Sequence, residues 1–169
     1  MLILSIQIRG RTNVRRQIHK LRMLCLFALI IVGFTGQPRV HADEPWKAED
    51  LIQPVDLKEL LVSDEKPLVL QTGIVHLYKM GHIPGSIYAG MASTAEGLAT
   101  LKKTVQDVPR TRTVVIYCGC CPMGDCPNIR PAYQALREMG FKAVKVLNLP
   151  TNFTQDWQMK GYPVEKGGA

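Results

Sequence analysis

Residues 43–169 alternate short apolar runs with segments in which apolar residues recur at helical spacing. A continuous, often β-branched run predicts a buried strand, and the helical spacing predicts a helix that packs on it. The predicted strands are 67–70, 113–117 and 143–146, and the predicted helices are 54–62, 93–105, 127–139 and 152–160. This alternation predicts one α/β domain in which helices cover both faces of a central parallel sheet.

Glycine and proline mark where these elements end. The segment Gly81-His-Ile-Pro-Gly-Ser86 is a predicted turn, because two glycines and a proline cannot continue a helix or a central strand. Pro127 suits the first turn of the helix over 127–139, and Gly140 suits its end. We expect His82, inside the turn, to fix the shape of the loop by hydrogen bonding.

Residues 1–42 follow a different pattern. They hold seven basic residues and no acidic one, and the charge-free apolar stretch Met23–Phe34 is followed by small or compact residues up to Ala42. This order predicts a secretory signal peptide that is cleaved after Ala42, and therefore a periplasmic or secreted protein. The alternative is an uncleaved membrane anchor, but the apolar stretch is short for a membrane-spanning helix, so we expect no stable membrane span after cleavage.

The positive charge of the chain belongs to this leader. The whole chain holds 21 Lys and Arg against 14 Asp and Glu, a net charge of +7, but residues 43–169 hold 14 of each sign. A nucleic-acid-binding domain carries a basic patch or stripe. The neutral body therefore predicts that nucleic acid is not a partner, and residues 43–169 are predicted to form a single exported domain.

Four of the five cysteines lie within nine positions, between the predicted strand 113–117 and the predicted helix 127–139. They are Cys118, Cys120, Cys121 and Cys126. In an open parallel sheet, ligands bind where strands end and helices begin. Unpaired N–H groups and the helix dipole stabilise an anion there, so a thiolate at this place is a candidate nucleophile. Structural disulfides are the alternative for an exported protein.

Four segments carry a resemblance to a known family. They are Gly81-His-Ile-Pro-Gly-Ser86, Tyr117-Cys118 at the end of a strand, Leu136-Arg-Glu-Met-Gly-Phe141 and Trp157-Gln-Met-Lys-Gly-Tyr-Pro-Val164. In this order, over nearly all of 47–166, they resemble the rhodanese-like domain. The resemblance implies an α/β domain around a parallel sheet. It also implies a sulfurtransferase in which one cysteine takes sulfane sulfur from a donor as a persulfide and passes it to an acceptor.

The resemblance also implies roles for the loop residues. By position, the persulfide cysteine falls on Cys118, and Cys126, directly before the helix, is the alternative. The expected substrate-binding residues are Gly119, Cys120, Cys121 and Arg130, and the expected resolving thiols are Cys121 and Cys126. We expect a small sulfur donor and a thiol or cyanide acceptor as partners, with a redox protein as a further candidate, and no cofactor or metal ion.

The chain departs from the family pattern in three places, one of which is Thr151-Asn152, where the family carries Gly-Gly before the final tryptophan. Gln71-Thr-Gly73 stands where the family usually carries Asp-x-Arg, and eleven residues separate Cys118 from Arg130, where the family's loop is much shorter. Phosphatase chemistry needs an arginine at a fixed distance to hold a phosphate, so it is not expected. A catalytically inactive rhodanese-like interaction domain is one alternative function.

Two further alternatives use the same cysteines. Cys118 and Cys121 form a Cys-x-x-Cys pair, the spacing that lets one thiolate attack and the other resolve, which indicates a thiol-disulfide redox protein. Together with Met123, the four cysteines also offer sulfur ligands that suit copper(I) or zinc, which indicates a soft-metal-binding module.

Overall fold

The computed structural model describes residues 44–168, in which five parallel strands form one sheet. The strands are β1 (Leu51–Ile52), β2 (Leu68–Gln71), β3 (Ile87–Tyr88), β4 (Val114–Tyr117) and β5 (Val144–Leu147). Their order across the sheet is β1-β5-β4-β2-β3, so β4 lies at the centre. Gln71 at the end of β2 pairs in register with Tyr117 at the end of β4. The predicted central parallel sheet is confirmed.

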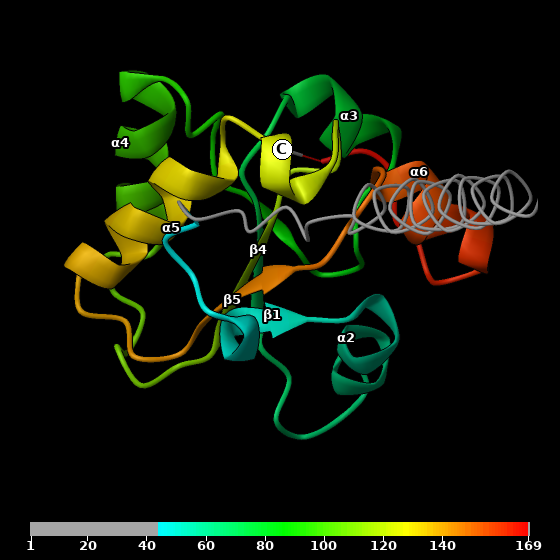
Figure 1. The fold of residues 1–169 in the computed structure, drawn as a ribbon, viewed down its shortest axis with the longest axis horizontal. Helices are drawn as coiled ribbons and strands as arrows, with labels where there is room; N and C mark the ends of the chain where they lie inside the picture. Colours follow the sequence, from blue (N-terminus) through cyan, green and yellow to red (C-terminus); the bar gives the residue numbers. More distant parts are fainter. Residues whose placement is uncertain (1–43, 169) are drawn as a thin grey trace, which may run out of the picture. The chain divides into compact units, whose positions relative to one another are not determined.

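Helices cover both faces of this sheet. They are α2 (Pro54–Leu60), α3 (Val75–Met80), α4 (Ala95–Thr104), α5 (Ile129–Glu138) and α6 (Phe153–Asp156), with the 3-10 turns η2 (Ala48–Asp50), η3 (Met123–Asp125) and η4 (Gln158–Lys160). Figure 1 shows α4 and α5 on one side of the sheet and α2 and α6 on the other. The predicted α/β class, with helices on both faces, is therefore confirmed.

The central strand β4 separates two hydrophobic cores. Val114 and Ile116 pack in the core that side chains of α4 and α5 complete. Val115 and Tyr117 point the other way, into the core that side chains of α2 and α6 complete. All four residues are buried, which explains why this strand is a continuous apolar run and not an alternating one.

Three short elements were not predicted from the sequence: β1, β3 and α3. The two strands have two residues each and lie at the edges of the sheet, paired with β5 and β2. Ile87 of β3 is 44% exposed. A strand of two residues is too short to give a recognisable apolar run in the sequence. It is defined by its hydrogen bonds to a neighbouring strand that lies far away in the sequence.

The predicted boundaries of two helices need correction. Pro127 lies outside α5, which begins at Ile129, because Asn128 occupies the N-cap and turns its side chain to other partners. The predicted helix over 152–160 is divided into α6 and η4 at Trp157, whose indole N–H donates to the Pro163 carbonyl. Gly140 has φ of +89° and follows the end of α5, as predicted.

His82 ties the predicted turn to the C-terminal segment. Its backbone exchanges two hydrogen bonds of 2.9 Å with Glu165. Its Nδ1 lies 2.8 Å from the Tyr78 carbonyl, and its ring stacks on the Tyr78 ring with centroids 3.8 Å apart. These contacts match the expected structural role, in which the histidine fixes the shape of the loop.

The predicted signal peptide lies outside the described residues, so the cleavage after Ala42 and the export of the protein stay predictions. Within residues 44–168, no helix is long and apolar enough to cross a membrane.

Candidate functional site

The cysteine loop begins at the carboxyl end of β4 and is held there by the neighbouring strand β2. Gln71, the last residue of β2, is buried and donates its Nε2–H to the Cys118 carbonyl at 2.9 Å. Its Oε1 accepts a hydrogen bond of 3.2 Å from the Gly73 N–H. One amide side chain therefore connects the first cysteine of the loop with the segment that follows β2. In the sequence, Gln71 stands out only as a departure from the family pattern.

The loop brings its sulfur atoms together. The sulfur atoms of Cys118 and Cys120 lie 3.1 Å apart, and those of Cys120 and Cys121 also lie 3.1 Å apart. The sulfurs of Cys118, Cys120 and Cys126 all lie within 4.8 Å of one another. All four cysteines are free thiols. The sulfur that lies 3.1 Å from the Cys118 sulfur is thus that of Cys120, whereas Cys121, the predicted redox partner of Cys118, lies 3.1 Å from the Cys120 sulfur.

The four thiols differ in their access to solvent. Cys118 and Cys126 are buried, with 3% and 0% of their surface exposed, whereas Cys120 and Cys121 are partly exposed. A reagent from solvent therefore meets Cys120 and Cys121 directly. It reaches Cys118 only at the edge of a cavity.

Electrostatics favour the thiolate at Cys126. A hydrogen bond from the Cys118 thiol, with further donation from the backbone N–H groups of Asn128 and Ile129, lowers the pKa of Cys126 to about 6 against the opposing effect of burial. The same hydrogen bond, followed by burial, raises the pKa of Cys118. Burial raises the pKa of Cys121. Cys126, two residues before the N-cap of α5, is thus the thiol whose anion the loop stabilises, and it was the alternative nucleophile expected from the sequence.

Asn128 is a site residue that sequence reasoning missed. Its side chain is buried, donates its Nδ2–H to the Cys118 sulfur at 3.4 Å and accepts a hydrogen bond of 2.9 Å from the Ser93 N–H. An asparagine before a helix is usually a cap for that helix. The available signal was its position two residues after Cys126, but only the fold shows that its amide faces sulfur.

Arg130, a predicted substrate-binding residue, already has hydrogen-bond partners in the loop and in the segment before β1. Its Nη2 donates to a Glu44 carboxylate oxygen and to the Gly124 carbonyl, both at 2.7 Å. Its guanidinium also lies over the Trp46 ring, 5.9 Å from the centroid. In this geometry Arg130 holds the cysteine loop against the segment that precedes β1.

Gly119 allows the chain to turn directly after Cys118. Its φ is +85°, which favours glycine, and a Cβ at this position would lie 2.8 Å from the Phe153 Cβ. Its carbonyl accepts a hydrogen bond of 3.1 Å from the Phe153 N–H. The loop is therefore attached to α6 as well as to β2. After this turn at Gly119, the chain continues to Cys120, whose sulfur contacts that of Cys118.

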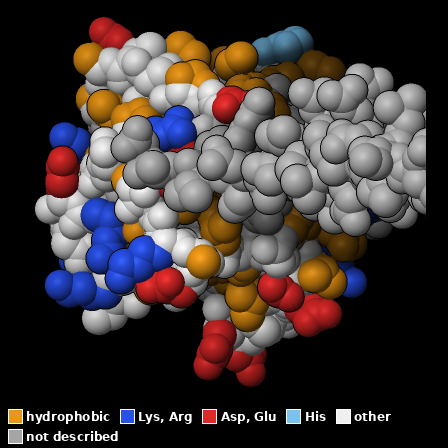
Figure 2. Space-filling view, in the orientation of Figure 1, with side chains coloured by type: hydrophobic (Ala, Val, Ile, Leu, Met, Phe, Trp, Pro, Cys, Tyr) orange, Lys and Arg blue, Asp and Glu red, His pale blue; other side chains and the backbone are white. Residues whose placement is uncertain are grey.

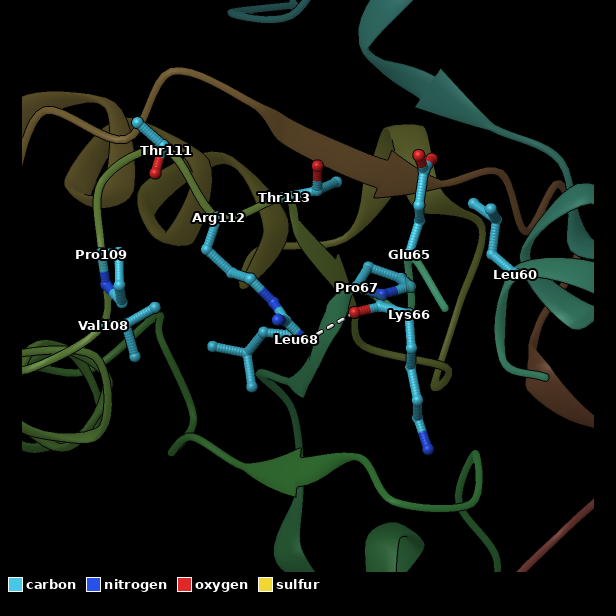
Figure 3. A pocket seen from close by; sticks show the side chains of 10 residues that line it. All are labelled: Leu60, Glu65, Lys66, Pro67, Leu68, Val108, Pro109, Thr111, Arg112 and Thr113. Carbon is cyan, nitrogen blue, oxygen red and sulfur yellow. Dashed lines mark hydrogen bonds between the residues drawn. The ribbon is translucent and has the colours of Figure 1, made fainter. Parts of the chain in front are cut away.

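A cavity of about 290 Å³ opens beside the start of the loop. Its polar lining includes Gln71 at the end of β2, Cys118 after β4, and Thr154, Gln158 and Lys166 from the C-terminal part of the domain. A second cavity, of about 700 Å³, lies at the opposite end of the strands. Figure 3 shows Leu68, at the start of β2, and Thr113, just before β4, among its lining residues. No cysteine lines the larger cavity, so the thiol chemistry belongs to the smaller one.

Charged side chains of both signs share the surface. Figure 2 shows lysine and arginine side chains beside aspartate and glutamate side chains on the visible face. Residues 43–169 carry 14 basic and 14 acidic residues. The expectation that nucleic acid is not a partner stays a prediction.

A parallel sheet with a cysteine-rich loop between its central strand and the next helix defines a thiol-bearing α/β domain. The family model described as the rhodanese-like domain matches residues 52–149, which is more than half of the chain. The chain therefore belongs to the rhodanese-like domain family, and the resemblance seen in the sequence is confirmed.

Solved structures share this fold. The chain resembles the Alr3790 protein from Anabaena sp., with 22% identity and a TM-score of 0.53 over 70% of this chain and 94% of that one. It resembles thiosulfate sulfurtransferase from Pseudomonas aeruginosa, with 23% identity and a TM-score of 0.55 over 74% of this chain and 20% of that one. It also resembles SseA from Escherichia coli, described as a 3-mercaptopyruvate sulfotransferase, with 17% identity and a TM-score of 0.52 over 71% of this chain and 52% of that one.

These likenesses establish the fold. The chain covers a fifth of the Pseudomonas enzyme and about half of the Escherichia enzyme. No curated protein matches the sequence.

Proposed function

We propose that this protein is an exported sulfurtransferase that carries sulfane sulfur on Cys118 as a persulfide. The observation that carries the proposal is the position of Cys118. Cys118 follows the central strand β4 and lines the smaller cavity, and its sulfur contacts the Cys120 sulfur and the Asn128 side-chain amide. Membership of the rhodanese-like family supports it, as do two structural neighbours whose names describe sulfur transfer.

In the first step, sulfur is loaded from a donor of the thiosulfate class. The Cys118 sulfur attacks the outer sulfur of thiosulfate, a new S–S bond forms, and sulfite leaves with the electrons of the broken S–S bond. The Cys118 proton passes to the Cys126 thiolate, whose sulfur lies within 4.8 Å of the Cys118 sulfur and whose pKa is lowered to about 6. Charge and atoms balance, because thiol, thiolate and thiosulfate become persulfide anion, thiol and sulfite.

In the second step, the persulfide gives up its outer sulfur. A nucleophile such as cyanide attacks that sulfur, thiocyanate leaves, and Cys118 returns as a thiolate that recovers its proton from Cys126. The Asn128 Nδ2–H, directed at the Cys118 sulfur, stabilises negative charge as it develops there. Of the expected substrate-binding residues, Gly119 lines the cavity, whereas Cys120 and Cys121 are partly exposed and lie outside its lining. Arg130 positions the loop through Glu44 and Gly124.

Sulfur transfer is tested with thiosulfate labelled in its outer sulfur, followed by cyanide. Wild-type protein should yield labelled thiocyanate, and Cys118→Ser should yield none while it keeps the wild-type circular dichroism spectrum. Absence of labelled product from the folded wild type contradicts the proposal. So does full activity in the folded Cys118→Ser variant.

Export is tested separately, by expressing the whole chain in a bacterium and fractionating the cells. The proposal expects a periplasmic protein whose mass corresponds to a chain that begins at Asp43. An uncleaved chain in the cytoplasm contradicts export, and an uncleaved chain in the membrane fraction contradicts cleavage after Ala42. Both outcomes leave sulfur transfer unaffected.

A second candidate function is supported by the 3.1 Å contact between the sulfurs of Cys118 and Cys120. The Cys120 thiol can attack the inner sulfur of the Cys118 persulfide, which forms a Cys118–Cys120 disulfide and releases hydrosulfide. A dithiol reductant then has to restore the two thiols. Under this thiol-redox function, loaded wild-type protein releases sulfide without an added acceptor, and loaded Cys120→Ser retains the persulfide.

A further inference from the structure

Three cysteine sulfurs converge from both ends of the cysteine loop. Cys118 follows β4, Cys126 precedes α5, and Cys120 lies between them, with all three sulfurs within 4.8 Å of one another. Among residues 44–168, this is the one group of three or more cysteine, histidine or acidic side chains placed to share an ion. We propose that Cys118, Cys120 and Cys126 form a binding site for copper(I).

The donor set selects the metal. It consists of sulfur atoms alone, and thiolate sulfur favours soft ions such as copper(I) over calcium, magnesium or manganese. Structural zinc sites are almost always tetrahedral with four protein ligands. The group offers three, and copper(I) accepts three sulfur ligands in a plane.

The spacing of the sulfurs fits a central ion. With metal–sulfur bonds of about 2.3 Å, three coplanar sulfurs lie roughly 4 Å apart. The sulfur–sulfur distances in the protein lie on either side of this value, since the sulfurs of Cys118 and Cys120 are 3.1 Å apart and no pair is more than 4.8 Å apart. A change of less than about 1 Å between Cys118 and Cys120 therefore opens the position that the ion needs.

The surroundings of the sulfurs suit an ion that enters from solvent and is then shielded. Cys120 is partly exposed and offers the first contact, whereas Cys118 and Cys126 are buried. The Asn128 Nδ2–H directed at the Cys118 sulfur supplies the kind of outer hydrogen bond that orients metal ligands. Binding forms copper–sulfur bonds and releases thiol protons to the buffer, with no change in the oxidation state of copper or sulfur.

The experiment uses reduced, metal-free protein under anaerobic conditions, titrated with copper(I) in competition with a coloured copper(I) chelator. We expect one ion per chain, and X-ray absorption of the complex should show a sulfur-only shell. Cys120→Ser should weaken binding on the order of 100-fold or more, because loss of an outer-sphere partner alone costs about 10- to 100-fold. Cys121→Ser is the matched control and should bind like wild type, because Cys121 lies outside the group of three.

Three results overturn the proposal. One is the absence of a chelator-resistant ion in folded wild-type protein. Another is a Cys121→Ser variant that loses as much affinity as Cys120→Ser, which would make the site a different one. The third is nitrogen or oxygen in the metal's first shell. None of these measurements involves a sulfur donor, so the test is independent of the proposed sulfur transfer.

Discussion

Gly73 lies directly against the sulfur of Cys118. A Cβ added to Gly73 would lie 2.5 Å from that sulfur, 3.1 Å from the Cys118 carbonyl oxygen and 3.1 Å from the Gln71 amide nitrogen. Gly73 closes the Gln71-Thr-Gly73 segment, where the family usually carries an arginine. The missing side chain therefore makes room for the sulfur of the candidate nucleophile.

Gly73→Ala is expected to destabilise the protein by about 1–3 kcal/mol, the usual cost of an added methyl group in a packed interior. The methyl group has to displace the Cys118 sulfur, so sulfur loading should fall as well. Denaturant unfolding and the labelled-thiosulfate assay measure the two effects. Gly124→Ala is the matched control, because its Cβ would make an ordinary 3.5 Å contact with Glu44. Equal behaviour of the two variants would contradict this reading of Gly73.

Asn128→Asp should slow the reaction of Cys118 with sulfur donors. The change keeps an acceptor for the Ser93 N–H but removes the Nδ2–H that faces the Cys118 sulfur, and it adds negative charge beside the thiols. Both effects disfavour the thiolate, and one pKa unit corresponds to about tenfold in thiolate population. The pH profile of persulfide formation should therefore shift upward.

The control for this variant is Asn148→Asp, whose amide bonds to Gln53 outside the sulfur cluster. The Asn148→Asp profile should overlay that of wild type. An unshifted profile in Asn128→Asp would show that the amide only supports the fold.

Cys126 should ionise as the pH rises through about 6 in reduced, metal-free protein, against an ordinary value of 9.0. The ultraviolet absorbance of thiolate reports this step, and Cys126→Ser should lack it. Because the folded-state pKa is lowered, the stability that this thiolate contributes is complete above pH 9 and is lost as the pH falls through 6. The stability difference between wild type and Cys126→Ser should therefore shrink on acidification. A first thiolate that appears only near pH 9 would contradict the assignment.

Arg130→Gln should reduce stability more than it reduces binding of the sulfur donor. Its guanidinium is paired with Glu44, whose other carboxylate oxygen is buried without a hydrogen-bond partner. A double-mutant cycle with Glu44→Gln should give a coupling of about 1–2 kcal/mol. Unchanged stability with a raised KM for thiosulfate would instead make Arg130 a substrate ligand, as the sequence predicted.

The sequence by itself determined the class of fold and the location of the chemistry. Val114–Tyr117 is a continuous apolar run because both of its faces are buried, and Gly140 ends α5 because it adopts a positive φ. Such local and periodic signals depend only on near neighbours in the chain. They placed the cysteines between a central strand and a helix, and the motifs around them identified the family.

The tertiary structure alone decided which side chains meet. Gln71 reaches Cys118 across 47 positions of sequence, and Asn128 turns toward sulfur instead of capping its helix. Cys118 contacts Cys120 and not the Cys-x-x-Cys partner that spacing favoured, because the loop turns at Gly119. Contacts of this kind depend on how β2, β4 and α5 pack together, and no periodicity along the chain records that packing.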